Sequence, residues 1–338
     1  MMVRVLVTGT AGFIGCAVAQ RLLRDGATVL GIDCLTPYYD LGLKEERVKL
    51  LRGSPAFAER RIDLADGPAT LAAVRDFLPD VVVHLAAQAG IRYSLDDPRS
   101  YTHSNVEGTL SVLEACRAVP VKHLIYASSS SVYGANTRVP FRETDRVDAP
   151  VSLYAATKRA NELMVQTYSH LFRIPASGLR FFTVYGPLGR PDMAYFKFTK
   201  AIFEGEEIDV YNHGRMKRDF TYIDEVVEAI ERLMLLPPVD RLAEGDIEPG
   251  RILPDVPHRL FNVGNHTPIP LERFIDVLEE IIGRKARRRL LPMQPGDVVS
   301  TFADVSALQQ AVGFSPSTPI EVGLTEFVDW YRAFYNVS

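Results

Sequence analysis

The sequence predicts an α/β protein in which a doubly wound parallel sheet is joined to a smaller C-terminal domain. Through the first 182 residues, short apolar runs of strand length alternate with amphipathic stretches of helical period. Continuous apolar runs are typical of strands buried on both faces, as in parallel sheets covered by helices. After residue 183 a loop with Pro187, Gly189 and Pro191 ends this alternation. We therefore expect domains at 1–182 and 183–338, with some later segments returning to the first, and 338 residues suffice for both.

The strands of the first half are expected where apolar residues cluster between turn signals. Each helix between them carries its apolar residues three or four positions apart. Strands are predicted at residues 3–8, 28–32, 61–64, 81–86, 123–128 and 176–182, and helices at 13–25, 69–77, 106–118 and 153–172. Later helices are predicted at 195–203, 224–235, 271–282 and 320–335, and the Pro- and Gly-rich stretch 237–258 is predicted to be an exposed excursion.

Composition and charge argue against several classes of protein. The formal net charge is −4 and no long basic run occurs, so neither nucleic acid nor a membrane is an expected partner. No apolar run reaches the length of a membrane span. The cysteines, Cys16, Cys34 and Cys116, are too few and scattered for a disulfide framework, which favours a reducing, cytoplasmic environment. The seven histidines show no metal-ligand spacing, so no metal site is expected.

A glycine-rich turn lies between the first predicted strand and the first predicted helix. It reads Gly9-Thr10-Ala11-Gly12-Phe13-Ile14-Gly15. Glycines at this spacing let the backbone turn tightly and approach a pyrophosphate, to which the helix N-terminus offers free N–H groups. Asp33 ends the second strand, where its carboxylate can accept bonds from both ribose hydroxyls. Cys34 follows instead of an arginine, so the pattern favours NAD over NADP on a Rossmann-type sheet.

Two further strand ends point to the same crevice. Asp63 and Leu64 follow the third predicted strand, where they could hold an adenine ring. Leu85, Ala86 and Ala87 follow the fourth, where small side chains would leave room for the cofactor. Ligands of doubly wound sheets bind outside the carboxyl ends of the strands, so these positions are predicted to line the site.

A tyrosine and a lysine one helical turn apart are the candidate catalytic groups. Tyr154 and Lys158 share one face of the helix predicted at 153–172. An ammonium beside a phenol, together with the charge of a nicotinamide, would lower the phenol pKa from its reference value near 10. A run of four serines, 128–131, leaves the fifth strand and could bond a substrate hydroxyl. The three features predict proton abstraction from an alcohol beside a nicotinamide, which is hydride-transfer chemistry.

These residues resemble the extended short-chain dehydrogenase/reductase family, and the resemblance extends over essentially the whole chain. The family's motif positions correspond here to Gly9, Gly12, Gly15, Asp33, Ser129, Tyr154 and Lys158. Stretches 37–40, 85–94, 182–187, 189–193 and 218–224 resemble the UDP-glucuronate 4-epimerases within that family. Leu188 departs from the tryptophan of that pattern, which we expect to affect packing rather than chemistry.

The resemblance implies a role for each matching residue. Ser129, Tyr154 and Lys158 would be the catalytic triad, with Asn105 steadying the active site. The implied NAD-binding residues are Gly9, Gly12, Phe13, Ile14, Gly15, Asp33, Asp63, Leu64, Leu85, Ala86, Ala87, Gln88, Asn105, Tyr154 and Lys158. The implied UDP-sugar-binding residues are Arg92, Ser129, Ser130, Ser131, Thr183, Arg190, Tyr211 and Arg218. Of these, Thr183 and Arg190 would face the sugar, Tyr211 the uracil and Arg218 the diphosphate.

The implied activity is the interconversion of UDP-glucuronate and UDP-galacturonate through a 4-keto sugar, with tightly bound NAD that is recycled. A homodimer through the helices at 106–118 and 153–172 is implied as well. A UDP-glucose/UDP-galactose 4-epimerase is the closest alternative, and Gln294, where those enzymes carry an arginine, leaves one phosphate contact open. A UDP-glucuronate decarboxylase and a non-catalytic NAD-binding regulator are further alternatives. A 4,6-dehydratase would need an acid/base pair where Ser130 and Ser131 stand.

Overall fold

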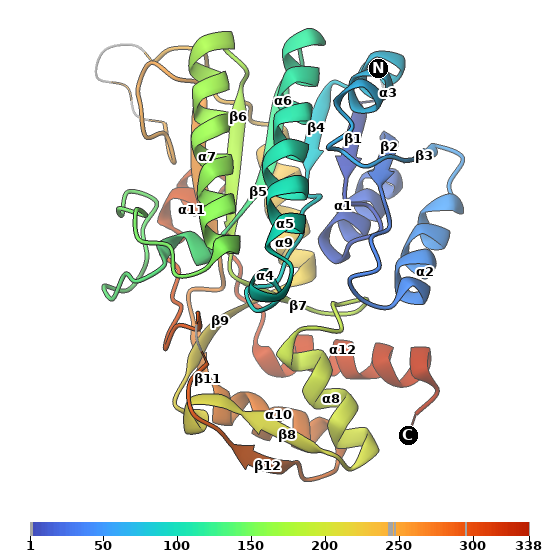
Figure 1. Cartoon of the computed structure of the whole chain (residues 1–338), viewed down its shortest axis with the longest axis vertical. Helices are drawn as coiled ribbons and strands as arrows, with labels where there is room; N and C mark the ends of the chain where they lie inside the picture. Colours follow the sequence, from blue (N-terminus) through green and yellow to red (C-terminus); the bar gives the residue numbers. More distant parts are fainter. Residues whose placement is uncertain (1–2, 243–245, 247, 295, 338) are drawn as a thin grey trace.

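The central sheet of the computed structural model, which describes residues 3–242, 246, 248–294 and 296–337, has seven parallel strands (Figure 1). Their order is β10-β6-β5-β4-β1-β2-β3. The strands are β1 (Arg4–Thr8), β2 (Thr28–Asp33), β3 (Phe57–Arg61), β4 (Val81–His84), β5 (His123–Ser129), β6 (Ala176–Phe181) and β10 (His258–Val263). The predicted doubly wound parallel sheet is confirmed.

One predicted strand is wrong. The third strand runs over Phe57–Arg61 and not over residues 61–64, so Asp63 and Leu64 belong to the loop that follows it. β3 is an edge strand that pairs only with β2 among the described strands, and most of its side chains are partly or fully exposed. It therefore carries Glu59, Arg60 and Arg61 instead of an apolar run, whereas Leu64 is buried beyond its end.

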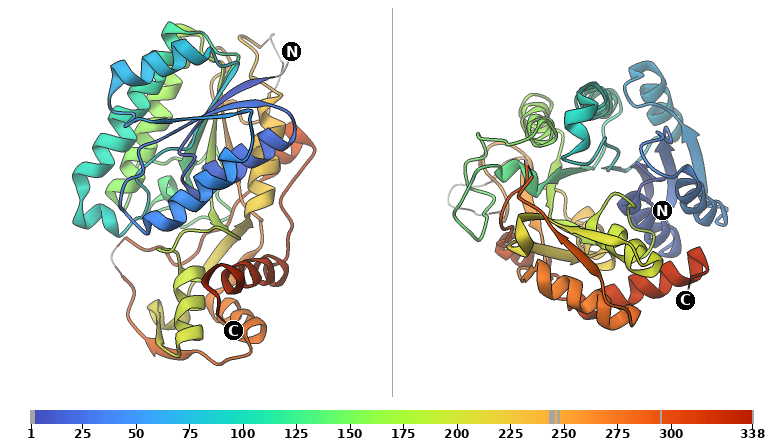
Figure 2. Two further views of the ribbon diagram at one scale, coloured as in Figure 1. Left: turned by 90° about the vertical axis from the view of Figure 1, so that its right-hand side faces the viewer. Right: turned by 60° about the horizontal axis from the view of Figure 1, so that its bottom comes forward.

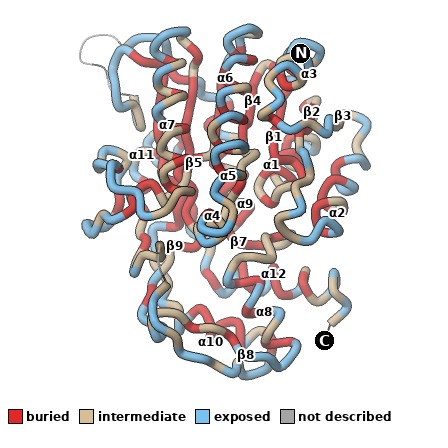
Figure 3. Tube along the Cα trace, in the orientation of Figure 1, coloured by how far each residue is buried: buried red, intermediate tan, exposed pale blue. Residues whose placement is uncertain are grey.

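Alternate side chains of the inner strands enter two cores on opposite faces of the sheet. In β1, Val5 and Val7 pack on one face and Leu6 on the other, as the two-residue period of a strand requires. Helices α1 (Phe13–Arg24), α9 (Ile223–Met234) and α11 (Ser306–Val312) cover the first face, and α3 (Gly67–Phe77), α6 (Gly108–Ala118) and α7 (Leu153–Phe172) the second (Figures 1 and 2). The inner strands are buried along their length (Figure 3).

Two helical segments near the carboxyl ends of the sheet strands differ from the prediction. Helix α2 (Leu41–Arg52) lies where no element is predicted, and the Asp40 side chain caps it by accepting from the Gly42 N–H. The α-helix predicted to begin at 106 begins as α6 at Gly108, after a π-helical turn, η1 (Thr102–Glu107). Short helices α4 (Tyr93–Asp96) and α5 (Pro98–Tyr101) precede η1.

The C-terminal layer packs below the carboxyl ends of the sheet strands (Figure 1). Two small sheets form there, one from β7 (Thr183–Tyr185), β9 (Lys217–Tyr222) and β11 (Pro268–Pro270), the other from β8 (Glu207–Val210) and β12 (Arg287–Leu290). The predicted later helices are confirmed as α8 (Ala194–Glu204), α9, α10 (Leu271–Ile282) and α12 (Ile320–Tyr335). Part of the predicted excursion, residues 243–245 and 247, lies outside the described residues.

Strand β10 begins where the excursion ends and pairs in parallel with β6, so this later segment returns to the central sheet. A single-turn 3₁₀ helix lies at Ser130–Tyr133, and Tyr211–Gly214 forms a tight turn in which Asn212 and His213 have left-handed backbone angles, with φ of +51° and +50°. None of the helices in the described part of the chain is long and apolar enough to cross a membrane.

Candidate active site

The turn between β1 and α1 brings its backbone unusually close to neighbouring segments. Gly9 has a φ of +79°, and a Cβ added there would lie 2.8 Å from the backbone nitrogen of Ala86. A Cβ on Gly15 would lie 2.1 Å from the carbonyl oxygen of Gly9, so helix α1 can start directly beneath the turn only because residue 15 is glycine. The turn is thus a cradle without side chains at a helix N-terminus, which suits a pyrophosphate.

Asp33 at the end of β2 orients this turn. Its Oδ2 accepts from the Ala11 N–H at 2.9 Å, and its Oδ1 accepts from the Leu35 N–H at 2.8 Å. A carboxylate has about four lone-pair sites, so both oxygens can still accept bonds from ribose hydroxyls. The geometry fits the role that the sequence predicts for Asp33.

A cavity of about 240 Å³ extends along the carboxyl ends of β1, β2, β4 and β5. All the NAD-binding residues predicted from the sequence line it except Asn105; they are Gly9, Gly12, Phe13, Ile14, Gly15, Asp33, Asp63, Leu64, Leu85, Ala86, Ala87, Gln88, Tyr154 and Lys158. The concave shape, the glycine cradle and the acidic strand end together fit a dinucleotide.

Asn105 lies behind the wall of this cavity, inside the π-helical turn η1, and is fully buried. Its amide oxygen accepts from the Gln88 N–H at 2.8 Å, and its amide nitrogen donates to the Gln88 carbonyl at 3.1 Å and to Thr157 Oγ1 at 3.0 Å. Asn105 therefore ties the strand-end loop at Gln88 to helix α7. This geometry supports a role in steadying the site rather than direct contact with a cofactor.

The structure adds a buried cation that the sequence analysis missed. Lys44 of α2 lines the same cavity, and its ammonium donates to the carbonyl and hydroxyl oxygens of Thr36 at 2.6 and 3.2 Å. Burial lowers the Lys44 pKa, although the nearby Asp33 carboxylate raises it. Lys44 makes no ion pair with a carboxylate in the described part of the chain. A buried ammonium without such a partner is suited to an anionic ligand.

Tyr154 and Lys158 both face the cavity from helix α7, which Ser152 caps by accepting from the Ala155 N–H at 3.1 Å. Lys158 donates to the Ala127 carbonyl at 3.0 Å, and its burial lowers the pKa of its ammonium to about 8. The sequence predicts that Lys158, together with the charge of a nicotinamide, lowers the Tyr154 pKa. In the protein alone, burial raises the Tyr154 pKa, and the Ser129 hydroxyl opposes that rise. The protein's own groups thus leave the phenol protonated at neutral pH.

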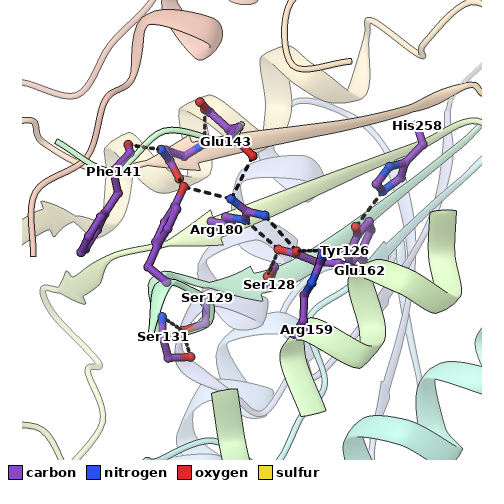
Figure 4. A network of polar contacts seen from close by, with 12 residues as sticks. Tyr126, Ser128, Ser129, Ser131, Phe141, Glu143, Arg159, Glu162, Arg180 and His258 are labelled. Atoms are coloured by element: carbon purple, nitrogen blue, oxygen red, sulfur yellow. Dashed lines mark hydrogen bonds and ion pairs between the residues drawn. The ribbon is translucent and has the colours of Figure 1, made fainter. Parts of the chain in front are cut away.

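The four serines of the run 128–131 have different partners. Ser128 Oγ donates to the buried Glu162 at 2.6 Å, away from Ser129, because successive residues of a strand point to opposite faces (Figure 4). Ser129 Oγ accepts from the N–H and the hydroxyl of Ser131 at 3.2 and 2.9 Å, and the Ser129 hydroxyl lowers the pKa of the Tyr154 phenol, which lines the same two cavities. Ser129, Ser130 and Ser131 line a second cavity, whereas Ser128 lines only the cofactor cavity.

This second cavity, of about 620 Å³, is lined both by residues at the carboxyl ends of the sheet strands and by residues of the C-terminal layer. Every residue predicted to bind a UDP-sugar lines it: Arg92, Ser129, Ser130, Ser131, Thr183, Arg190, Tyr211 and Arg218. The two cavities share a wall formed by Tyr38, Ser129, Tyr154, Phe181, Phe182, Arg190 and Met193. Two ligands bound in them would therefore meet at the Ser129–Tyr154 pair.

The arginines of the second cavity differ in how they are paired. Arg190 holds Asp192 with two bonds of 3.0 and 2.6 Å, and Tyr38 donates to the same carboxylate at 3.1 Å. Arg92 pairs with Asp297 at 3.1 Å and lies over the Tyr211 ring, 4.5 Å from its centroid. Arg218 makes no ion pair with a described carboxylate within 4 Å, and burial lowers its pKa. Arg218 is thus available to an anion.

The site combines a glycine turn at the carboxyl ends of the parallel strands, where the strand order reverses, with a neighbouring Ser–Tyr–Lys group. This combination defines a class of dinucleotide-dependent enzymes that act on alcohols. Residues 5–241 match the NAD dependent epimerase/dehydratase family, and the chain belongs to that family. A probable UDP-glucuronate 4-epimerase of Rhizobium meliloti is 48% identical over 337 residues, which cover 98% of each chain.

Solved structures agree with this assignment. The UDP-glucuronic acid 4-epimerase from Bacillus cereus in complex with UDP-glucuronic acid and NAD superposes with a TM-score of 0.87 at 31% identity, over 98% of this chain and 100% of that one. A UDP-glucose 4-epimerase from Thermotoga maritima with UDP-glucose superposes with a TM-score of 0.85 at 27% identity, over 98% and 99% of the two chains.

Proposed function

We propose that the protein interconverts UDP-glucuronate and UDP-galacturonate by NAD-dependent 4-epimerisation through a 4-keto sugar. The observation that carries this proposal is the meeting of the two cavities at Ser129 and Tyr154. The relatives named UDP-glucuronate 4-epimerases support the choice of sugar, since they match over 98% of the chain or more.

NAD⁺, when bound, supplies the acceptor for the C4 hydride and a positive charge that favours ionised Tyr154. In its phenolate form, Tyr154 takes the proton of the sugar 4-hydroxyl as the C4–H bond breaks and the ketone forms. Ser129 donates a hydrogen bond to the same oxygen and stabilises its developing charge. Lys158 holds its place through Ala127 and adds positive charge to the cavity wall. Tyr154 would return its proton to the 4-oxygen, and the hydride supplied by the reduced cofactor to the opposite face of the ring would complete the inversion.

The C6 carboxylate of glucuronate places a further demand on the site. A ketone at C4 is β to that carboxylate, and β-keto acids lose CO₂ readily. We propose that Ser130, Ser131 and Thr183, with Arg190, hold the carboxylate away from the alignment that releases CO₂. Their place on the wall of the substrate cavity, next to the Ser129–Tyr154 pair, supports this assignment.

We further propose that residues 1–182 hold the cofactor, whereas 183–338 mainly bind the UDP-sugar. The guanidinium of Arg218 donates from Nη1 to the carbonyls of Lys217 and Val299 but has no described carboxylate within 4 Å, and its remaining N–H donors suit the diphosphate. Tyr211, with Arg92 over its ring, offers a flat face to the uracil. The residues that line the cofactor cavity come largely from the first 182 positions, which supports this division.

We also propose a homodimer in the cytoplasm. Leu110 of α6 and Leu163 and Leu171 of α7 expose 42%, 48% and 60% of their surface, so an apolar face on adjacent helices is available to a second copy. The thiols of Cys16 and Cys116 are buried without disulfides, as is typical of proteins in a reducing compartment. Sedimentation of the native protein and of the Leu163→Lys variant would test the dimer.

The decisive experiment gives the purified protein UDP-glucuronate without added cofactor and separates the products by ion-pair chromatography. We expect UDP-galacturonate and no UDP-pentose. Tyr154→Phe should abolish turnover but keep the melting temperature and the bound NAD, because the phenyl ring preserves the packing. Conversion of UDP-galactose alone would transfer the function to the hexose epimerases, and a UDP-pentose product would indicate a decarboxylase.

A further inference from the structure

A buried ion pair joins helix α7 to strand β6 directly behind the catalytic end of β5 (Figure 4). Arg180 donates to both oxygens of Glu162, from Nε at 2.8 Å and from Nη2 at 3.0 Å. Both side chains are only 1% exposed. Neither residue lines the cofactor cavity or the substrate cavity, so the proposed reaction does not use them as contacts.

The Glu162 carboxylate also fixes the strand end that carries Ser129. Ser128 Oγ donates to Glu162 Oε1 at 2.6 Å, which is short, as expected for a hydroxyl bonded to a carboxylate. Ser128 and Ser129 are neighbours in β5 and point to opposite faces, so a fixed Ser128 side chain sets the direction of the Ser129 side chain. Ser129 and Tyr154 both line the wall that the two cavities share, and the Ser129 hydroxyl lowers the Tyr154 pKa.

The same carboxylate is tied to the helix that carries the base. Glu162 follows Lys158 by four residues on α7, about one helical turn further along. Arg159 of the same helix donates to Glu162 Oε2 at 3.0 Å and limits the rotamers that Glu162 can adopt. The Glu162 carboxylate thus links α7 to the end of β5, beside the bond from Lys158 to the Ala127 carbonyl, and it is the link that acts on the Ser128–Ser129 end of the strand.

Arg180 extends the network to the wall of the substrate cavity. Its Nη1 donates to the Tyr133 hydroxyl at 3.0 Å, and Tyr133 donates to the Asn262 amide oxygen of β10 at 2.6 Å. Arg180 lies in β6, three residues before Thr183, so the network also reaches the segment proposed to face the sugar. The network links β5, β6, β10 and α7 in one fixed arrangement.

The energetics of buried ion pairs argue that this pair serves orientation. Removing two charges from water is costly, and well-packed apolar residues of similar volume often stabilise a core equally well or better. A bidentate pair with further hydrogen bonds on both partners instead defines one geometry, because each oxygen and each N–H must stay within hydrogen-bond range. An enzyme that must bring a hydroxyl and a phenol onto one substrate oxygen needs such a fixed geometry.

We propose that Glu162, held by Arg180 and Arg159, is a positioning residue that sets Ser129 against Tyr154 through Ser128. The proposal rests on the proposed epimerisation, in which Ser129 and Tyr154 share the sugar 4-oxygen. It predicts that loosening the Ser128–Glu162 bond slows the chemical step without weakening the binding of NAD or of the UDP-sugar.

The test compares two variants that each lose one buried serine hydroxyl. Ser128→Ala removes the bond to Glu162. Ser177→Ala, on the neighbouring strand β6, removes a bond of 2.9 Å to His123 Nε2 and a longer one of 3.4 Å from Arg259 Nη2, and Ser177 lines neither cavity. Both should lower the melting temperature by similar amounts. Only Ser128→Ala should lower kcat, by about tenfold or more, with KM for the UDP-sugar unchanged; because Ser128 also lines the cofactor cavity, kcat is measured on NAD-saturated protein. The acid limb of the Ser128→Ala kcat–pH profile should move to higher pH, because the Ser129 hydroxyl, which lowers the Tyr154 pKa, is less firmly placed.

Hydrogen exchange provides a readout that does not depend on the substrate. The Ser131 N–H donates to Ser129 Oγ and should exchange faster in Ser128→Ala than in Ser177→Ala. If the native protein fails to convert UDP-glucuronate, the proposed function falls and this exchange rate alone decides the positioning role. The double variant Glu162→Leu/Arg180→Met avoids an unpaired buried charge, so it should fold and show the same loss of kcat. Native kcat in Ser128→Ala, or equal exchange in the two serine variants, would overturn the proposal.

Discussion

Three of the seven histidines make the stability of the central sheet sensitive to acid. Burial lowers the pKa of His84 and of His123 to about 3 and that of His258 to about 4, and each ring is held neutral by hydroxyl groups. In the unfolded chain these rings titrate near 6.5. Below pH 6.5 the unfolded state therefore binds protons that the folded state excludes, and stability falls as the pH falls.

The magnitude follows from the number of protons. Each excluded proton costs ~1.4 kcal/mol per pH unit. Glu143 acts in the opposite direction, because burial raises its pKa to about 6 and its folded form takes up a proton between about pH 6 and 4.5. About two protons remain, or ~3 kcal/mol per pH unit. With a typical unfolding entropy for 338 residues, this corresponds to a fall in Tm of ~4 °C per pH unit.

The assay is thermal unfolding followed by circular dichroism in buffers between pH 7 and 4.5, at constant ionic strength. His123→Gln should have a lower Tm at pH 7 but a pH slope smaller by about one proton, or ~2 °C per unit. His170, which is exposed at the end of α7, provides the control variant His170→Gln, whose slope should equal that of the native protein. A native Tm that stays constant down to pH 4.5, or equal slopes for all three proteins, would refute the linkage.

Three further predictions concern the two cavities. Gly15→Ala should deplete bound NAD at least tenfold, because its Cβ would lie 2.1 Å from the carbonyl oxygen of Gly9. The bound NAD is measured by chromatography of the nucleotide released on denaturation. The control Gly53→Ala, at a helical φ of −64°, should keep its bound NAD. Lys44→Met should reduce bound NAD without lowering Tm, since it removes a buried ammonium but keeps the apolar stem; full NAD occupancy would contradict the anion-binding role of Lys44. Arg218→Met should raise KM for the UDP-sugar by ~10–100-fold with a smaller change in kcat, because the variant loses one charged hydrogen bond to the substrate. An unchanged KM would place the diphosphate elsewhere.

The sequence predicts the inner part of the fold better than its edges, for a physical reason. Buried strands such as β1 and β4 must be apolar on both faces, so their pattern is visible without any partner. Helix α2 hides its pattern because Lys44 and Arg47 occupy positions on its buried face. Arg47 is fully buried and donates to the carbonyl oxygens of Ala11, Leu188 and Gly189, which come from distant segments. The spacing of apolar residues cannot reveal a buried helix face whose charged side chains donate their hydrogen bonds to backbone carbonyls.

The candidate site follows the same logic. Residues at strand ends, such as Asp33 and Ser129, could be predicted because all parallel strands of one sheet end at the same edge. The role of Glu162 could not, since its partners Ser128 and Arg180 are 34 and 18 residues away. The division of the serine run also needed the structure, because only the pairing of β5 decides which hydroxyl faces α7 and which faces the cavity.

Two groups of charged side chains along the substrate cavity differ in net charge, and this difference bears on how a sugar could be inverted. Near Tyr154, Arg190 is balanced by Asp192, so that end is close to neutral. Arg218 lies with Arg92 and Asp297, and this group keeps one positive charge. A diphosphate is therefore favoured at the Arg218 group, and it would anchor the substrate there. Epimerisation requires the ring to present both faces to one base. A free guanidinium beside the ring would bind the C6 carboxylate in one orientation, whereas a balanced pair and neutral hydroxyls allow both.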